Sequence, residues 1–239
     1  MGPEVVGLLP MGGNGTRLGL PFPKSLAPTI TNDGIVPLYV HSLRRLQEVA
    51  PVVYAAVNAN TCRCLRRSLD GQNVRAIEVE EQPSLPKALS QAAKIILGDV
   101  GRDVWIAVAL PDSIWNVHEG VSLRNVVDAV REDGALALFM AGADELDNVV
   151  AVGNKVMSVT TKQPGDTGMV RGWGAFVIRA KAMLAFNDKE KDGPQLGKLD
   201  MGWAFLGHSI DLGTPDRYVR WHDMRSQNAR PGEGLLVSR

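Results

Sequence analysis

Residues 8–18 of the chain read Leu-Leu-Pro-Met-Gly-Gly-Asn-Gly-Thr-Arg-Leu, and residues 23–26 read Pro-Lys-Ser-Leu. The apolar run that leads into this stretch predicts a buried strand, and the strand ends in three glycines within four positions. Glycine lets the backbone approach a ligand closely and adopt positive φ, so successive N–H groups can converge on an anion. Arg17 and Lys24 follow closely, one as a fork of donors and the other as a point charge. The stretch therefore suits a polyphosphate.

The stretch fits neither of the two common phosphate motifs. No G-x-x-x-x-G-K-[ST] loop can be written here, and Leu18 stands where the dinucleotide fingerprint has its third glycine. On the glycines alone, a glycine-rich turn with two solvated cations explains the residues as well as a phosphate site does.

The whole string decides between these readings, because it resembles the signature of the sugar-1-phosphate nucleotidylyltransferases (pyrophosphorylases). That family has G-G-x-G-T-R-L, a short variable loop and then P-K. The resemblance implies that Arg17 and Lys24 are catalytic cations. The four residues between Leu18 and Pro23 make a loop closer to the uridylyl- and cytidylyltransferase branches than to thymidylyl- and glucose-type enzymes. The implied nucleotide-binding residues of this segment are Pro10, Met11, Gly12, Gly13, Asn14, Gly15 and Thr16.

The composition excludes several classes of protein. With 239 residues the chain can bury a sizeable core and is most simply one α/β domain. Its formal net charge is zero, so we expect neither nucleic-acid nor membrane-surface binding. No apolar run is long enough to cross a bilayer and no signal peptide is evident, which predicts a cytoplasmic protein. Cys62 and Cys64 predict reduced thiols, because two cysteines without a partner cluster are weak evidence for metal.

Strand-like and helix-like segments alternate along the first part of the chain. This alternation predicts βαβ units and a single-domain mixed, mainly parallel sheet with helices on both faces. We expect a nucleotide-binding half of about residues 1–140 and an acceptor-binding half of about residues 141–225. The predicted strands are 52–57, 74–79, 104–110, 135–140, 174–178 and 204–211, with a hairpin at 149–160. The predicted helices are 35–49 with Pro37 at the first helical position, 63–69, 86–97, 121–131, 179–186 and 215–222. We also predict a loop at 187–198 and a loosely ordered tail from 225.

Asp112 follows the most strand-like run of the chain, separated from it by Pro111. Ligands of open α/β sheets bind just past the C-terminal ends of the strands. A carboxylate there can hold Mg²⁺ against phosphates. For these residues alone, an Asx-turn is the favoured explanation. The family usually has G-D at this place, so the resemblance implies that Asp112 is a metal ligand and Pro111 a nucleotide contact.

Residues 209–218 read Ser-Ile-Asp-Leu-Gly-Thr-Pro-Asp-Arg-Tyr. Thr214 as N-cap and Pro215 at the first helical position predict the start of a helix. A cap explains Thr-Pro but not the Asp-x-Gly that precedes it. The string resembles the second hallmark of the same family, D-x-G-T-P-x-x-Y, and this resemblance implies that Asp211 supplies the other metal carboxylate.

The acceptor side follows the family pattern less closely. Lys162 stands where the family commonly has E-K-P, and the resemblance implies that it binds the acceptor phosphate. Thr161 replaces the glutamate that binds sugar hydroxyls, which argues against a standard hexose. Residues 171–177 resemble the N-A-G-x-x-x-F segment of the sugar site, which implies acceptor contacts for Trp173 and Gly174. A tryptophan in a glycine-flanked strand is, by itself, more often a core residue.

Gln82 matches the glutamine that precedes G-T-A in the family, although that tripeptide is absent here. An amide can both donate to and accept from a base edge, so Gln82 is a predicted nucleotide contact.

Taken together, the resemblance implies a GT-A-like, Rossmann-like nucleotidyltransferase that uses Mg²⁺. Its substrates would be an NTP and a small phosphorylated acceptor, giving an NDP-sugar or an NDP/CDP-alcohol and pyrophosphate. One alternative is a cytidylyltransferase of a non-sugar phosphate or phosphonate. Another, of a different class, is a non-catalytic relative that binds a nucleotide for regulation. The sequence leaves open the base, the acceptor and whether the chain forms a homodimer or homotetramer.

Overall fold

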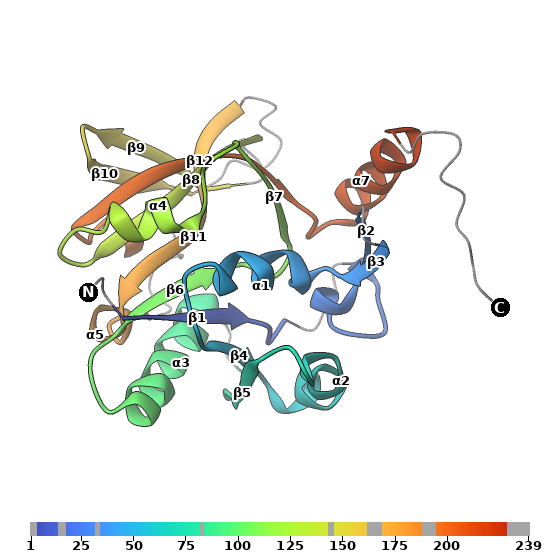
Figure 1. Ribbon diagram of the computed structural model, residues 1–239, viewed down its shortest axis with the longest axis horizontal. Helices are drawn as coiled ribbons and strands as arrows, with labels where there is room; N and C mark the ends of the chain where they lie inside the picture. Colours follow the sequence, from blue (N-terminus) through green and yellow to red (C-terminus); the bar gives the residue numbers. More distant parts are fainter. Residues whose placement is uncertain are drawn as a thin grey trace.

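The computed structural model describes residues 4–13, 18–31, 34–81, 84–142, 146–161, 169–187 and 195–228, with side chains as far as Asp223. In this part of the chain, ten strands form one sheet. The sheet runs in the order β5-β4-β1-β6-β11-β8-β12-β7, and the hairpin β9–β10 joins it at β11. Figure 1 shows helices above and below these strands. The predicted mixed α/β sheet is therefore confirmed.

One half of the sheet is parallel throughout. Strands β5, β4, β1 and β6 pair in parallel, with Gly7 opposite Val53 and Val6 opposite Ile106. Parallel neighbours place all their C-terminal ends at the same edge, which is where loops gather to bind ligands. The four strands are β1 (Val5–Pro10), β4 (Val53–Val57), β5 (Val74–Glu78) and β6 (Trp105–Ala109).

The other half of the sheet mixes directions. Strand β11 is antiparallel to both β6 and β8, β8 and β12 are parallel, and β12 and β7 are antiparallel. The predicted hairpin is present as β9 and β10. The strands are β7 (Ser113–Val117), β8 (Gly134–Gly142), β9 (Asn148–Val152), β10 (Lys155–Thr160), β11 (Met169–Arg179) and β12 (Met201–Asp211).

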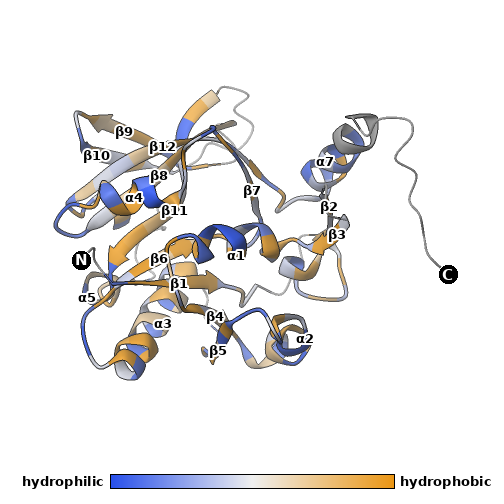
Figure 2. Ribbon diagram, in the orientation of Figure 1, coloured by the Kyte–Doolittle hydropathy of each residue, from blue (hydrophilic) through white to orange (hydrophobic). Residues whose placement is uncertain are grey.

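Buried residues of the helices pack with buried residues of the strands to form two apolar cores. One core takes residues of α1 (Tyr39–Gln47), α2 (Ala59–Leu69) and α4 (Leu123–Asp128), and the other takes residues of α3 (Leu85–Val100) and α5 (Ala180–Met183). Strand residues alternate between the cores, since side chains alternate across a sheet. Figure 2 shows β1 and β6 in hydrophobic colours and hydrophilic residues on the visible side of α1.

A small third core joins the N-terminal hairpin to the last helix. Here Leu38, Ile114, Leu212 and Trp221 are buried together. The Tyr218 hydroxyl donates to the carbonyl of Pro28, and Figure 1 shows α7 beside β2. The elements are the 3-10 helix η2 (Lys24–Leu26), β2 (Pro28–Thr31), β3 (Gly34–Pro37) and α7 (Pro215–Asn228).

Several predicted boundaries were wrong. Pro37 ends strand β3 instead of opening a helix, because residues 34–37 pair with residues 28–31 and Leu38 N–H donates to Ala27 (2.8 Å). Helix α2 begins at Ala59, four residues earlier than predicted, because Asn58 and Thr61 form a capping box. Residues after Asp112 form strand β7, where we predicted only a turn. Helix α7 continues to Asn228, into the predicted loose tail.

Of the predicted loop at residues 187–198, residues 188–194 lie outside the described part. None of the helices in the described ranges is both long and apolar enough to span a bilayer.

Candidate nucleotide and metal site

Asp112 lies just beyond the C-terminal end of β6, and its backbone is fixed from two sides. The Ser42 hydroxyl of α1 donates to the carbonyl of Leu110 (2.7 Å). The N–H of Leu212 donates to the carbonyl of Asp112 itself (2.9 Å). Pro111 between them is buried. These contacts hold the carboxylate at the sheet edge where ligands of parallel strands bind.

Asp211 ends strand β12 and lies opposite Ser113 in the antiparallel pair β12–β7. This pairing brings the second predicted carboxylate next to the first, although the two are far apart in sequence. Strand β7 is the element that makes the approach possible, because it starts directly after Asp112 and runs alongside β12.

Gly213 lies at the point where the predicted polar groups meet. A methyl group on its Cα would lie 2.8 Å from Oδ1 of Asp211, 3.3 Å from Nζ of Lys24 and 3.5 Å from Oδ2 of Asp112. A side chain here would therefore have to displace at least one of the three groups. We call Lys24, Asp112, Asp211 and Arg217 the site cluster.

Lys24 forms an ion pair with Oδ2 of Asp112. Helix η2 carries the lysine, and the Pro23 carbonyl accepts from Leu26 N–H (2.9 Å), which closes this turn. The side chains of Lys24 and Asp112 are 19% and 15% exposed, so water screens the pair less than it screens surface charges.

Arg217 was not predicted as a site residue. Its Nη1 donates to Oδ2 of Asp211 (3.0 Å), while the N–H of Gly213 donates to Oδ1 of the same carboxylate (2.8 Å). Arg217 lies in the first turn of α7, where the helix dipole disfavours a cation. An arginine at such a position, just after Asp-x-Gly, could have indicated a nearby carboxylate.

The structure describes only the first part of the glycine-rich loop. Pro10 ends β1, Met11 is buried and its N–H donates to Ala56 (2.7 Å). The Asn58 side chain donates to the carbonyl of Gly12 (2.7 Å). A methyl group on Gly13 would meet no described atom within 4 Å. Among the described residues, nothing therefore fills the space beside the Cα of Gly13.

Asn58 also was not predicted. It is buried, and besides holding Gly12 its side chain accepts from Thr61 N–H (2.8 Å) at the start of α2. One side chain therefore caps a helix and fixes the end of β1. The predicted residues Asn14, Gly15, Thr16, Arg17, Gln82 and Lys162 lie outside the described residues.

The predicted acceptor residues Trp173 and Gly174 lie in β11. The Trp173 side chain is 4% exposed and packs edge-on against Phe176, with ring centroids 5.6 Å apart. A methyl group on Gly174 would lie 3.0 Å from the Phe139 ring and 3.6 Å from Nε1 of Trp115. Trp173 is thus a core residue, as is usual for a tryptophan in a glycine-flanked strand, and its contact with an acceptor stays a prediction.

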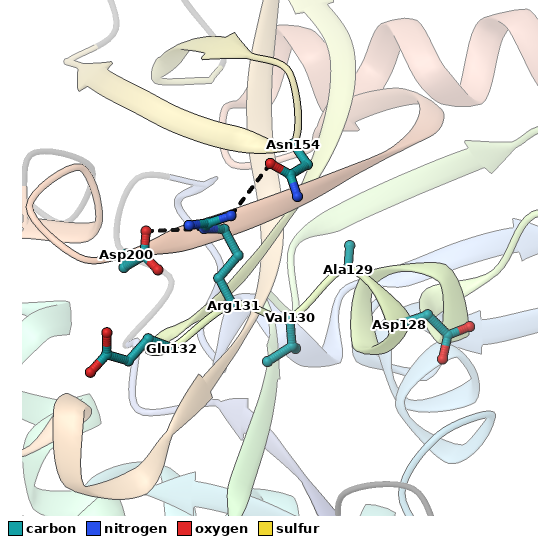
Figure 3. A pocket seen from close by; sticks show the side chains of 7 residues that line it. All are labelled: Asp128, Ala129, Val130, Arg131, Glu132, Asn154 and Asp200. Atoms are coloured by element: carbon teal, nitrogen blue, oxygen red, sulfur yellow. Dashed lines mark hydrogen bonds and ion pairs between the residues drawn. The ribbon is translucent and has the colours of Figure 1, made fainter.

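Two cavities have no residue of the site cluster among the residues that line them. A cavity of about 320 Å³ lies between α1 and β7 and is lined by His41, Arg44, Arg45, Glu48, Ser113 and Trp115. A cavity of about 540 Å³ is shown in Figure 3 and is lined by Asp128, Ala129, Val130, Arg131, Glu132, Asn154 and Asp200. No predicted site residue in the described ranges lines the second cavity.

An ion pair joins two of the residues that line this second cavity, Arg131 and Asp200. In Figure 3 the Arg131 side chain reaches both Asp200, at 3.0 Å, and Asn154, at 3.3 Å. Lys155 pairs with the same Asp200 oxygen at 3.1 Å. Hydrogen bonds from Arg131 and then from Lys155 hold the pKa of Asp200 below its ordinary value. We call Arg131, Lys155 and Asp200 the cavity cluster.

The described residues contain no group of three or more His, Cys, Asp or Glu side chains that could hold a metal by themselves. Cys62 and Cys64 are both free thiols. A metal at Asp112 and Asp211 would therefore need further oxygen ligands from a bound substrate or from water.

Comparison with known proteins shows which solved structures share this fold. No family model and no curated protein matches the chain. Solved structures do match. A UDP-glucose pyrophosphorylase from Acinetobacter baumannii aligns with a TM-score of 0.70 at 16% identity, covering 97% of this chain and 95% of that one. The fold is shared with solved nucleotidyltransferases.

Two further structures show the same likeness. A UDP-glucose pyrophosphorylase complexed with UDP-glucose aligns with a TM-score of 0.70 at 14% identity, covering 94% of this chain and 99% of that one. The inositol-1-phosphate CTP transferase from T. maritima aligns with a TM-score of 0.64 at 16% identity, covering 94% and 96%. At this level of identity the likeness establishes the architecture over nearly the whole chain.

Proposed function

We propose that this protein is a nucleotidyltransferase that joins the nucleoside monophosphate of an NTP to a sugar-1-phosphate or a similar phosphate. One observation carries the proposal: Lys24, Asp112 and Asp211 converge beside Gly213 from three separate segments. Two sequence hallmarks at opposite ends of the chain thus meet at the ligand-binding edge of the sheet. The shared fold with solved pyrophosphorylases supports the same reaction class.

The donor set of the site fits Mg²⁺. Asp112 and Asp211 offer carboxylate oxygens, the ligands that this hard cation prefers, and their number suits an ion that keeps its other positions for substrate phosphates and water. When bound, Mg²⁺ neutralises charge on the phosphates and polarises the phosphoryl oxygens.

The chain's own groups would position the triphosphate and stabilise its charge. In the proposed reaction an acceptor phosphate oxygen forms a bond to the α-phosphorus, and the bond from that phosphorus to the bridging oxygen breaks. Pyrophosphate leaves with the electron pair. The N–H groups near Gly12 and Gly13 would hold phosphate oxygens, Lys24 would neutralise charge at the α-phosphate, and Arg17 would neutralise pyrophosphate. Positioning and charge stabilisation supply most of the rate in such transfers.

The acceptor side favours a substrate other than a standard hexose phosphate. Thr161 stands where the family has the glutamate for sugar hydroxyls, and Lys162 is proposed to hold the acceptor phosphate. A heptose, a cyclitol or an alcohol or phosphonate phosphate fits this change. The structural likeness to an inositol-1-phosphate CTP transferase supports including a cyclitol phosphate and CTP in any screen.

The test begins with thermal unfolding of the protein against ATP, GTP, CTP, UTP and dTTP, each with and without Mg²⁺. A ligand at about 100 times its Kd stabilises by roughly 2.7 kcal/mol, which shifts Tm by a few degrees. We expect one triphosphate to stand out. Release of pyrophosphate is then measured with that triphosphate and a panel of phosphorylated acceptors.

The outcomes separate the proposal from its alternatives. Pyrophosphate release with one acceptor supports transfer and names the substrate. A thermal shift without pyrophosphate release for any acceptor supports a non-catalytic nucleotide-binding relative. No shift and no release would overturn the proposal.

A further inference from the structure

Both carboxylates of the site cluster are paired with cations of the chain itself. Lys24 pairs with Asp112, and Arg217 pairs with Asp211. The four side chains are between 15% and 19% exposed, so none of these charges is fully solvated. Two acids and two bases leave the cluster formally neutral.

The two cations lie in different places relative to the acids. We call the two carboxylate oxygens nearest Gly213, Oδ1 of Asp211 and Oδ2 of Asp112, the inner oxygens. Nζ of Lys24 lies near them, because a methyl group added to Gly213 would lie 3.3 Å from this nitrogen. Arg217 instead binds Oδ2 of Asp211, the oxygen other than the one nearest Gly213. Lys24 thus lies beside the inner oxygens, whereas Arg217 binds the other oxygen of Asp211.

A divalent cation that binds these inner oxygens would compete with the Lys24 ammonium. Like charges at such short range repel strongly where water is partly excluded. Lysine carries its charge on a flexible four-carbon stem, so the ammonium can move to another anion when one is present. A triphosphate supplies that anion, and it also brings negative charge that offsets the metal.

We propose that Lys24 is the built-in counter-ion of the metal site, so that a divalent cation enters only together with a polyphosphate that draws the ammonium away. This inference rests on the proposed function, because it takes Asp112 and Asp211 as the metal carboxylates. It adds an order of binding: metal without nucleotide binds weakly, and metal with nucleotide binds well.

The test measures Mn²⁺ binding to the full chain without any nucleotide, from the EPR signal of free Mn²⁺. Lys24→Met removes the charge and keeps an unbranched side chain of similar length. We expect the Kd for Mn²⁺ to fall by about tenfold or more in this variant, since one competing charge at contact distance is gone. Thermal unfolding of the variant checks that it is folded.

Two matched variants control the experiment. Lys155→Met breaks another Lys–Asp pair, the one with Asp200, and should leave the Mn²⁺ affinity of the wild type unchanged. The double variant Lys24→Met/Asp112→Asn removes the acid as well as its counter-ion and should lose the gain.

The inference is overturned if Lys24→Met binds Mn²⁺ no more tightly than the wild type, or if Lys155→Met produces the same gain. Failure of the proposed function would give a different experimental result. It would appear in the wild type as no thermal shift with any triphosphate and no release of pyrophosphate, whatever the Mn²⁺ affinities are.

Discussion

The site cluster and the cavity cluster contain the same kinds of charged groups in different surroundings. In the site cluster the paired side chains are 15–19% exposed. In the cavity cluster Arg131 and Asp200 are 31% and 25% exposed, and Lys155 is 48% exposed. Water and salt therefore screen the second cluster more than the first.

The clusters also differ in how the chain builds them. The site cluster gathers residues from η2, the end of β6, the end of β12 and the start of α7 around one glycine. The cavity cluster joins the loop between α4 and β8, the start of β10 and the residue before β12, and its two cations meet at one oxygen of Asp200 instead of beside a glycine at the ends of parallel strands. Both clusters contain Arg–Asp and Lys–Asp pairs, so an ion pair alone does not identify the candidate site. Burial and convergence at a strand edge are what distinguish the two.

The largest expected effect follows Asp112→Asn. The amide keeps the shape of the side chain but loses the charge that would hold a metal and that pairs with Lys24. We expect turnover to fall by about 10²–10³-fold, the cost of removing one preorganised charge-stabilising group. Pyrophosphate release measures the rate, and thermal unfolding confirms the fold. Near wild-type turnover would contradict the assignment of Asp112.

The second largest loss of turnover is expected for Gly213→Ala, which tests whether the positions of the groups beside Gly213 matter. The added methyl would lie 2.8 Å from Oδ1 of Asp211, so the carboxylate or Lys24 must shift. A misplacement of about 1 Å can cost up to about 100-fold in rate.

The matched control is Gly98→Ala in α3, where a methyl meets no described atom within 4 Å. Alanine there should stabilise the protein by about 0.5–1 kcal/mol and leave turnover unchanged. Equal turnover for both glycine variants would show that the groups around Gly213 tolerate movement.

The fold could be predicted largely from local patterns. Apolar runs such as residues 104–110 fix buried strands, and alternation with helical segments leads to a mixed sheet. The hairpin at residues 149–160 was predictable because Gly153 and Asn154 form a two-residue turn signal. These features depend on neighbours in sequence, which is why single-sequence reasoning finds them.

Features that depend on distant partners were not predictable. Residues 34–37 become a strand only because residues 28–31 lie beside them, and β7 exists because β12 pairs with it. The positions of Asp112 and Asp211 in sequence indicated the sheet edge, but not that both carboxylates lie beside Gly213. Asn58 acts through a contact across the fold, with the carbonyl of Gly12. Arg217 acts locally, on a carboxylate six residues before it, and its role in the reaction stays a prediction.

A smaller effect is expected for Arg217→Met, which leaves both carboxylates in place. Arg217 fixes the outer oxygen of Asp211 and thereby turns the inner oxygen toward the cluster. Without it, we expect the metal concentration for half-maximal turnover to rise about tenfold, the scale of losing a group that orients a metal ligand.

Arg217→Lys should recover part of this loss, because the ammonium can still bond one carboxylate oxygen. A purely structural role would instead lower Tm in both variants and leave the metal requirement unchanged. Arg217→Met should weaken metal binding, whereas Lys24→Met should strengthen it. The two variants together therefore distinguish a cation that orients the metal-binding carboxylate from a cation that occupies the position of the metal.

The smallest effect is expected in the cavity cluster, for Asp200→Asn. Hydrogen bonds from Arg131 and Lys155 lower the pKa of Asp200 in the folded protein, so the ionised form is favoured by folding. Its contribution to stability is present above the ordinary pKa of aspartate and is lost as the pH falls through the folded-state pKa. At neutral pH we expect Tm to drop by at most about 2 °C, because the groups are partly exposed and water screens their ion pairs.

The difference in Tm between wild type and Asp200→Asn should shrink toward zero in acid. Asp99, whose pKa is lowered chiefly by the hydrogen bond from Tyr54, titrates in both proteins and cancels from this difference. Turnover at neutral pH should equal that of the wild type. If Asp200→Asn reduced turnover as strongly as Asp112→Asn, burial and convergence would not be what separates the two clusters, and the cavity would have to be part of the reaction site.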